Sequence, residues 1–264
     1  AAEVGCNTFL LEKSNELGGL ASLISKIPAK NRLADFPHYL MHRAEQLDNL
    51  YIFKNTEGTP ENIRKFHPNI IVSSTGSAPL LPPIAGLKDR IDNENHNIYS
   101  ILGMISHIND FPKDLEGKKV VVVGGGAVGL DVVEFFADRN ADISIVEMMD
   151  QIGRDLDPVS KNDTKTMMKK HNVHQLTKTA LLEVKDSSFL VKGDGEPYEL
   201  PFEYGFVCLG MRAQGQLYQN LTEEFSSEDV EIMNIGDSQR ARRIIDGTQE
   251  GRNILTVLEQ KGYL

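Results

Sequence analysis

The sequence predicts an α/β fold in which two parallel-sheet units of the same plan are nested, one inserted into the other. Three observations support this prediction. A buried-type strand at 120–123 runs directly into a glycine-rich turn and a helix. An apolar strand that ends in a glutamate occurs twice, at Thr8–Leu11 and at Asp142–Val146. A further short strand at 230–235 follows the second unit and returns the chain to the first.

The glycine-rich turn follows Val120 to Val123, an uninterrupted β-branched run typical of a central parallel strand that is covered on both faces. Gly124, Gly126 and Gly129 occupy the three glycine positions of G-x-G-x-x-G, and a helix is expected over 127–139. In this Rossmann-like pattern the first glycine permits a tight turn, the second lets a pyrophosphate approach the backbone, and the third lets the helix pack on the strand. A glycine turn alone can be purely structural. With strand, helix and acid in order, the sequence predicts a dinucleotide site formed by Gly124, Gly126, Ala127, Val128 and Gly129.

The acid is Glu147, which follows the strand Asp142–Val146 and comes 18 residues after Gly129. This is close to the separation of about 20 expected for the residue that binds an adenosine ribose. Its carboxylate would repel the 2'-phosphate of NADPH, so the sequence predicts a preference for NADH. The neighbours Met148 and Met149 carry no charge, and Arg154 is the nearest downstream cation.

The bulk properties exclude several classes of protein. The chain has 264 residues, enough for two domains, with 40% hydrophobic and 25% charged residues. Its formal charge of -10 argues against a nucleic-acid partner. Neither a run of 18 or more apolar residues nor a signal peptide is recognisable, so we expect a cytoplasmic protein without a membrane partner.

The cysteines and histidines predict neither a redox pair nor a metal site. Cys6 and Cys208 are far apart in the sequence, so neither a disulfide framework nor a C-x-x-C motif is available. His38 with His42, and His171 with His174, could each share a helix face, but no third ligand is close in sequence. We therefore expect no dithiol–disulfide chemistry between the chain's own cysteines.

The expected division of the chain places one domain at 1–86 and 212–264, and a second, inserted domain at 87–211. The proline-rich segment 78–86 marks the crossing. Within the first domain we expect a helix over 32–46, strands at 50–54 and 70–72, and a closing helix over 242–260. In the second we expect a helix over 160–170, a strand over 176–184, and hairpin turns at 185–186 and 193–195. The strand and glycine loop that should open the first unit are expected upstream of Ala1.

Two further positions, Gly210 and Asp237, are interpreted from the strands that they follow. The strand at 205–209 ends in Gly210 much as 70–72 ends near Gly76, so Gly210 is included in the predicted nucleotide site. Asp237 follows a strand and precedes a helix, so taken alone it fits either a helix N-cap or a carboxylate that binds sugar hydroxyls.

Several motifs together resemble the flavoproteins that have two dinucleotide-binding domains, and the resemblance covers nearly the whole chain. The motifs are Glu12-Lys13 with Leu17-Gly18-Gly19, Ser74 to Pro79, Pro82 to Gly86, Gly124 to Gly129, and Gly236-Asp237. The resemblance implies that the first domain binds FAD and the second NAD(P)H. It also implies that Glu12 holds the adenosine ribose of FAD, with Lys13, Gly18 and Gly19 in the adjoining turn. The backbone near Glu57 would meet the adenine, Thr75-Gly76 would lie near the flavin, and Gly236-Asp237 would bind the ribityl or phosphate region.

Within these flavoproteins the chain is most similar to the C-terminal region of the Old Yellow Enzyme-like NADH:flavin oxidoreductases, the group of 2-enoate and 2,4-dienoyl-CoA reductases. The residues that carry the similarity are 10–14, 16–19, 151–156 and 241–251. Such enzymes place a barrel with FMN and an iron-sulfur cluster before this region, and the barrel reduces carbon-carbon double bonds. The resemblance therefore implies an electron-input module that passes hydride from NADH to FAD and serves an upstream barrel domain or an electron-acceptor protein.

Other functions remain open at this stage. A stand-alone NADH dehydrogenase or ferredoxin-type reductase fits the same motifs, and so does a non-catalytic nucleotide-binding domain. Because the first strand and glycine loop of the FAD domain are expected upstream of Ala1, we expect residues 1–264 alone to hold FAD weakly.

Overall fold

The computed structural model describes all residues 1–264, and the chain folds as two compact units. Unit 1 consists of Ala1–Ser25, Asn31–Ala78 and Met211–Leu264, and unit 2 consists of Lys26–Lys30 and Pro79–Gly210. The short segment Lys26–Lys30 therefore belongs to unit 2, although both of its flanks belong to unit 1. Sequence patterns did not indicate this segment.

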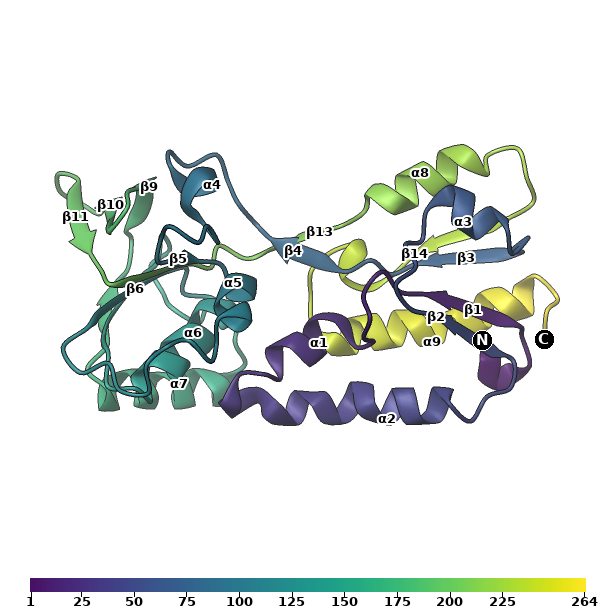
Figure 1. Ribbon diagram of the computed structural model, residues 1–264, viewed down its shortest axis with the longest axis horizontal. Helices are drawn as coiled ribbons and strands as arrows, with labels where there is room; N and C mark the ends of the chain where they lie inside the picture. The colour runs from purple at the N-terminus through teal and green to yellow at the C-terminus, as the bar shows by residue number, and fades with distance from the viewer. The chain divides into compact units, whose positions relative to one another are not determined.

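Unit 2 is built on a five-stranded parallel sheet, of which β5 and β6 are labelled in Figure 1. Its strand order is β5 (Ile98–Tyr99), β12 (Tyr204–Val207), β6 (Lys119–Val123), β7 (Asp142–Val146) and β8 (His174–Leu176). The valine run thus forms the central strand, and Val120 to Val123 are all buried, as predicted. Every strand of this sheet points its carboxyl end toward the same edge.

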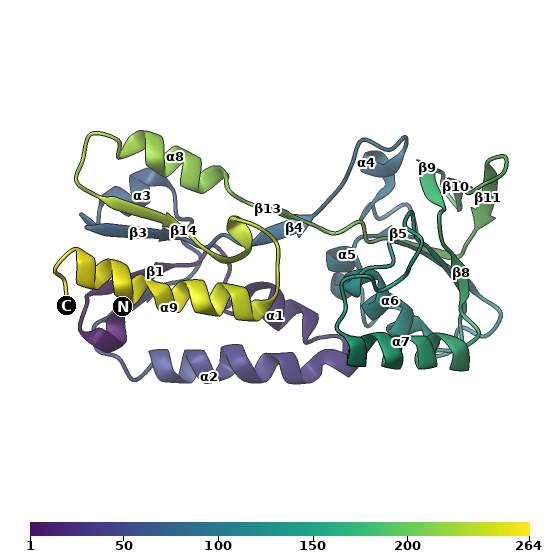
Figure 2. The same cartoon turned by 180° about the vertical axis from the view of Figure 1, so that it is seen from behind.

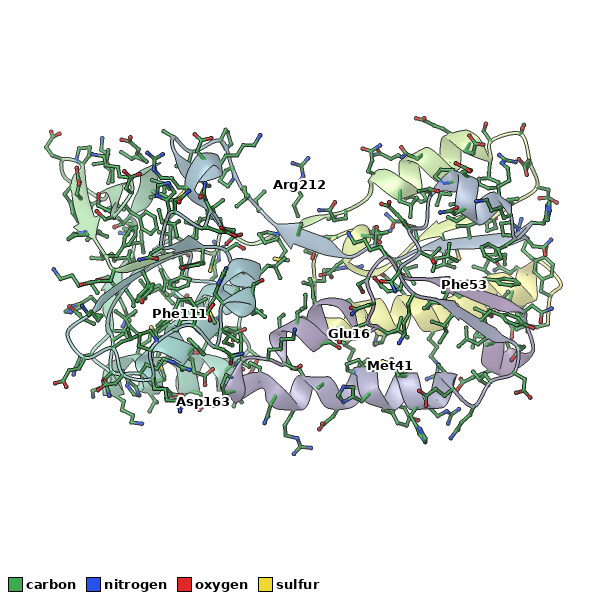
Figure 3. All side chains as sticks on the ribbon, in the orientation of Figure 1. Glu16, Met41, Phe53, Phe111, Asp163 and Arg212 are labelled. Carbon is green, nitrogen blue, oxygen red and sulfur yellow. The ribbon has the colours of Figure 1, made fainter.

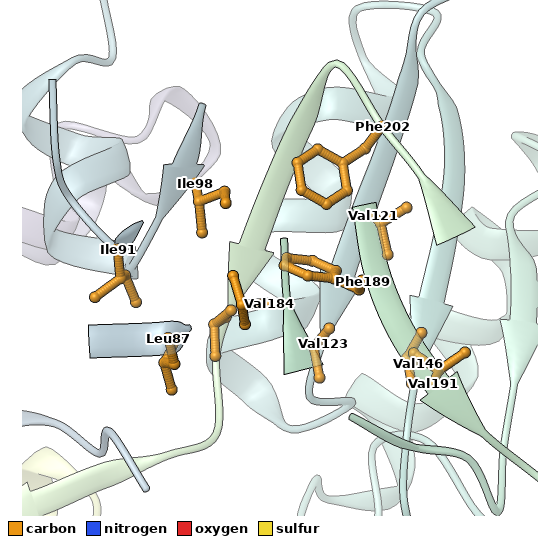
Figure 4. Close-up of a cluster of buried hydrophobic side chains, with 11 residues drawn as sticks. Leu87, Ile91, Ile98, Val121, Val123, Val146, Val184, Phe189, Val191 and Phe202 are labelled. Atoms are coloured by element: carbon orange, nitrogen blue, oxygen red, sulfur yellow. The ribbon is translucent and has the colours of Figure 1, made fainter. Parts of the chain in front are cut away.

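Both faces of this sheet are covered. On one face α6 (Ala127–Ala137) packs through aromatic rings, with Phe136 4.8 Å from Phe206 of β12 between ring centroids, and α5 (Ile101–Ser106) contacts α6 and β5. On the other face lies an antiparallel sheet of β9 (Ala180–Val184), β10 (Ser188–Lys192) and β11 (Tyr198–Pro201). Figure 4 shows the apolar cluster between these sheets, in which Val121 and Val123 contact side chains of β9 and β10. The remaining helices of unit 2 are α4 (Leu87–Arg90) and α7 (Pro158–Lys170).

Unit 1 contains two separate pairs of parallel strands. One pair is β1 (Thr8–Leu11) with β2 (Leu50–Phe53), and the other is β3 (Ile70–Ser73) with β14 (Glu231–Asn234). Its helices, all labelled in Figure 2, are α1 (Gly19–Ile24), α2 (Asp35–Ala44), α3 (Pro60–Arg64), α8 (Gln216–Glu224) and α9 (Ile244–Gln260). Short 3-10 turns lie at Ala2–Val4, Pro28–Ala34 and Gly236–Ser238. The buried cluster of this unit, formed by Ile71, Leu221 and Phe225, is small.

The pair β1–β2 leaves large apolar side chains open to solvent. Phe9 is 41% exposed and Tyr51 is 45% exposed, and their rings stack with centroids 5.2 Å apart. Phe53, labelled in Figure 3, is also exposed. These strands therefore bury far less apolar surface than the central strands of unit 2.

The structure confirms the predicted α/β class and corrects several boundaries. The strand predicted over 176–184 is broken at Thr177–Thr179, because Lys178 adopts a left-handed conformation with φ 51°. The helix predicted over 32–46 is limited to Asp35–Ala44, because the preceding segment forms a 3-10 turn. Two short strands that were not predicted, β4 (Ser77–Pro79) and β13 (Met211–Ala213), pair where the chain passes between the units. None of the helices combines the length and the apolar content that a bilayer crossing requires.

Candidate functional site

The glycine loop of unit 2 connects β6 to α6, and two of its glycines are required by close backbone contacts. Gly124 has φ 110°, and a Cβ built there would lie 2.1 Å from the carbonyl oxygen of Cys208. A Cβ on Gly129 would lie 1.9 Å from the carbonyl oxygen of Gly124. Both positions exclude a side chain because the neighbouring atom is backbone and cannot move aside. The first and third glycines therefore have a structural role in holding helix and strand together.

Gly126 differs from these two. It is the N-cap of α6 in an extended conformation, with φ -79° and ψ -178°, which any residue can adopt. A Cβ on Gly126 would meet no atom within 4 Å, and no side chain caps the helix. The space at the N-cap of this 11-residue helix is thus open, a side chain on Gly126 would fill it, and no side chain caps the first-turn amides. This cradle fits the pyrophosphate of a dinucleotide.

Glu147 lies beside the same loop, at the carboxyl end of β7. Its Oε2 accepts a hydrogen bond of 2.7 Å from the Gly125 amide, and its Oε1 accepts one of 2.7 Å from the Met149 amide. The carboxylate is half-buried, so its position is set by two backbone donors while lone pairs remain for further hydrogen bonds. The structure brings together the glycine loop and the predicted ribose-binding acid.

Gly210 follows β12 at the same edge of the sheet. It has φ 101°, a Cβ there would meet no atom within 4 Å, and its carbonyl oxygen accepts a hydrogen bond of 2.9 Å from the Leu80 amide. Because β12 lies directly beside β6, the turns that follow these two strands are neighbours. Ala127 and Val128, in the first turn of α6, are exposed and half-buried respectively.

Two cations lie close in the fold to Glu147. The Gly153 amide donates a hydrogen bond of 2.7 Å to the carbonyl oxygen of Gly125, which brings exposed Arg154 to the loop. The Lys178 amide donates one of 2.9 Å to the carbonyl oxygen of Met149, and the Lys178 side chain is exposed. Only Arg154 was expected from sequence, because Lys178 lies 31 residues after Glu147.

In unit 1, Glu12 ends β1 in a turn of similar design. Its Oε1 accepts hydrogen bonds of 2.8 Å from both the amide and the hydroxyl of Ser14. Its carbonyl oxygen accepts the Thr56 amide at 2.9 Å, which places the turn before Glu57 beside it. Lys13 and Glu57 are exposed. Gly18 caps α1 with φ 103°, and Gly19 has φ 51° and open space around its Cβ position.

A second cluster of unit 1 gathers the other predicted residues. Asp237 Oδ2 accepts a hydrogen bond of 3.0 Å from the Ser77 hydroxyl, and Oδ1 accepts the Arg242 amide at 2.9 Å. Thr75 donates its hydroxyl to the carbonyl oxygen of Gln214 at 2.6 Å, and the Gln214 amide donates to the carbonyl oxygen of Gly76 at 2.9 Å.

This cluster settles one alternative left by the sequence. Asp237 is not the N-cap of α9, since Arg243 holds that position. Gly236 donates its amide to Glu250 Oε2 at 2.6 Å, which ties the turn to α9. The first residues of α9, Ile244 and Ile245, are 50% and 58% exposed.

Sequence reasoning missed an ion cluster on α6. Lys30 Nζ lies 3.0 Å from Asp131 Oδ1 and 3.1 Å from Glu134 Oε2. Burial raises the pKa of Asp131, although Lys30 opposes that shift. No local pattern could have revealed the cluster, because Lys30 lies 101 residues before Asp131.

The two thiols are both free. Cys208 is fully buried, and burial raises its pKa to about 12, so the thiol is protonated at neutral pH. Cys6 is half-buried in unit 1. No group of three or more His, Cys, Asp or Glu side chains is placed to hold a metal ion.

A parallel sheet with a glycine loop, a free helix N-terminus and an acid at one edge, in a chain that also holds a second unit of related plan, defines the class of flavoproteins with two dinucleotide-binding domains. The chain belongs to the pyridine nucleotide-disulphide oxidoreductase family, whose profile matches residues 40–233. Membership of this family, predicted from the motifs, implies FAD and NAD(P)H as cofactors.

Individual relatives match nearly the whole chain. It is 25% identical over 252 residues to an NADH oxidase of Thermoanaerobacter brockii, covering 95% of this chain and 37% of the relative. It is 26% identical over 289 residues to a metal reductase of Desulforamulus reducens, covering 96% of this chain and 40% of the relative. Among solved structures, 2-naphthoyl-CoA reductase in complex with 2-naphthoyl-CoA has the same fold, with a TM-score of 0.79 and 23% identity over 95% of this chain and 36% of that one. The chain thus spans about two fifths of the length of these relatives.

Proposed function

We propose that this chain is the electron-input module of an NADH-dependent flavin oxidoreductase, with NADH bound by unit 2 and FAD by unit 1. One observation carries the proposal: the open cradle at Gly126, bounded by the first-turn amides of α6 and by Glu147. Family membership supports the oxidoreductase class.

For NADH, the first-turn amides of α6 would receive the pyrophosphate, because amides at a helix N-terminus favour anions. Glu147 would accept hydrogen bonds from the adenosine ribose hydroxyls. Its two existing amide donors fix the carboxylate in place, so little side-chain entropy remains to be lost on binding. Gly210 would lie beside the nicotinamide half, because in such sheets a dinucleotide extends across the ends of neighbouring strands.

For FAD, Glu12, Lys13, Gly18 and Gly19 would bind the adenosine ribose and its surroundings. The adenine would meet the backbone near Glu57. The second cluster, with Thr75, Gly76, Gly236 and Asp237, would hold the flavin and its ribityl chain. The nicotinamide and the flavin supply the hydride-transfer chemistry when both are bound, and the protein supplies their binding and orientation.

The final electron acceptor is proposed from the family resemblance alone and lies outside residues 1–264. The resemblance to 2-enoate and 2,4-dienoyl-CoA reductases suggests a barrel with FMN and an iron-sulfur cluster that reduces enoates or enoyl-CoA. The fold shared with 2-naphthoyl-CoA reductase is compatible with that acceptor.

The test replaces Gly126 with Val. A valine adopts the extended conformation of this position readily, and its Cβ meets no protein atom, so the free energy of unfolding should change by less than about 0.5 kcal/mol. Its side chain would occupy the cradle, so NADH affinity should fall by at least roughly a hundredfold. Isothermal titration calorimetry with NADH measures this loss.

Gly195 offers a matched control, because a Cβ there also meets no atom within 4 Å but lies in the turn between β10 and β11. Gly195→Val should bind NADH like the wild type. Unchanged NADH affinity in a folded Gly126→Val variant would refute the proposed site.

A further inference from the structure

The ion cluster on α6 is held by the segment Lys26–Lys30, which belongs to unit 2. Ile27 is 1% exposed, and the Lys30 amide donates a hydrogen bond of 2.8 Å to the Ile27 carbonyl oxygen. This buried anchor and closed turn fix the start of the Lys30 side chain. Lys30 Nζ then contacts both Asp131 and Glu134, which lie three positions apart on α6.

The two carboxylates lie on the helix whose N-terminus faces the cradle. Asp131 and Glu134 come five and eight positions after the N-cap Gly126, which corresponds to about 8 Å and 12 Å along the helix axis at a rise of about 1.5 Å per residue. The side chains of Asp131 and Glu134 are 25% and 37% exposed, so solvent and salt screen them only in part. Two unpaired negative charges at this distance would oppose the binding of a pyrophosphate.

We propose that Lys30 is a positioning residue for the phosphates of the nucleotide, which acts by neutralising the acidic pair on α6. This inference rests on the proposed function, in which the N-terminus of α6 binds NADH. Lys30 turns a local charge of -2 into -1 and holds both carboxylates toward itself. The adjacent Cys208 thiol is neutral and adds no charge.

The protonation of Lys30 supports this role. Burial lowers the pKa of its ammonium, but the charges and hydrogen bonds of Asp131 and Glu134 outweigh burial, so the pKa is raised above its ordinary value. Lys30 therefore carries its charge across the neutral pH range.

The experiment compares ligands with and without phosphate. In Lys30→Met, the affinities for NADH and ADP should each fall roughly three- to tenfold at low ionic strength, and the difference should shrink as salt is added. The affinity for adenosine, which has no phosphate, should stay unchanged. A purely structural role of Lys30 would weaken all three ligands alike.

Two further variants complete the test. Adding Asp131→Asn and Glu134→Gln to Lys30→Met should restore ADP binding to within about twofold of the wild type, because the charges that Lys30 offsets are gone. Lys192→Met is the control. It removes an exposed lysine of β10 that lies far from α6 in the sequence, and it should leave ADP binding unchanged. If Lys30→Met does not fold, the double variant Asp131→Asn, Glu134→Gln, which keeps Lys30, serves as the test instead. This variant should bind ADP more tightly than the wild type does.

The outcomes separate the two claims. A wild-type protein that binds neither NADH nor ADP overturns the proposed function and this inference with it. A wild type that binds both, with equal affinities in Lys30→Met or with a loss shared by adenosine, overturns the role of Lys30 alone. If Lys30→Met is unfolded and the double variant Asp131→Asn, Glu134→Gln binds ADP no more tightly than the wild type, the role of Lys30 is likewise overturned.

Discussion

Glu147 is the residue at which nucleotide selectivity should be decided. The Gly125 and Met149 amides orient its carboxylate, and at about 4 Å a like-charged 2'-phosphate would be repelled by on the order of 1 to 4 kcal/mol. The wild type should therefore bind NADH at least roughly tenfold more tightly than NADPH. In Glu147→Gln, which keeps an oxygen for one amide but loses the charge, this discrimination should collapse. Competitive titration of both nucleotides at fixed ionic strength measures it.

Arg154 and Lys178 provide the internal control for this prediction, because both are exposed cations tied through the backbone to the same turn. Replacing either with Gln should leave NADH affinity unchanged and weaken any residual NADPH binding. Equal affinities for NADH and NADPH in the wild type would show that Glu147 does not select between them.

Whether a site residue can be predicted from the sequence depends on how far apart its contacts lie along the chain. Glu147 was identified from its distance to Gly129, because strand, loop and helix impose a regular spacing within one unit. Lys30 could not be identified, because its contacts with Asp131 and Glu134 are made by tertiary packing alone.

At the scale of elements, the turn between β6 and α6 should be destabilised by the single methyl group that replacing Gly124 with Ala adds. Gly124 combines φ 110° with a carbonyl oxygen 2.1 Å from the position of a Cβ. Gly124→Ala should lower the free energy of unfolding of unit 2 by about 2 to 4 kcal/mol, because it requires both a strained alanine and displacement of the Cys208 backbone that follows β12. Urea denaturation followed by circular dichroism measures the change. Gly195→Ala should stay within about 0.5 kcal/mol of the wild type, and a similarly stable Gly124→Ala would contradict the contact.

Elements with strong periodic patterns were predicted well, and those shaped by single backbone conformations were not. The valine strand, its helix and the hairpins of β9 to β11 follow from composition and turn residues. The break at Lys178 does not, because nothing in its sequence marks a left-handed lysine. The hydrogen bond that the Lys178 amide donates to the carbonyl oxygen of Met149 is a long-range contact, and it interrupts the strand that the apolar residues on either side predict.

For the whole molecule, the two units should differ in how firmly they retain a nucleotide. Unit 2 has a central strand, a glycine loop and an 11-residue helix in succession, whereas β1–β2 and β3–β14 of unit 1 form separate pairs, with no such loop before β1 within residues 1–264. We therefore predict that residues 1–264 bind NADH but retain well under one FAD per chain after gel filtration. Flavin absorbance and the mass of the intact protein measure this. One equivalent of FAD on a chain that starts at Ala1 would refute the prediction.

The pairing of β4 with β13 has a consequence for the origin of this architecture. The chain enters the long segment of unit 2 at Pro79 and leaves it at Gly210, and the Leu80 amide lies 2.9 Å from the carbonyl oxygen of Gly210. A stretch whose two ends meet can enter a surface turn of a host protein without separating the residues on either side. The geometry therefore permits residues 79–210 to enter the chain of unit 1 as one piece, with its two ends held together by β4 and β13.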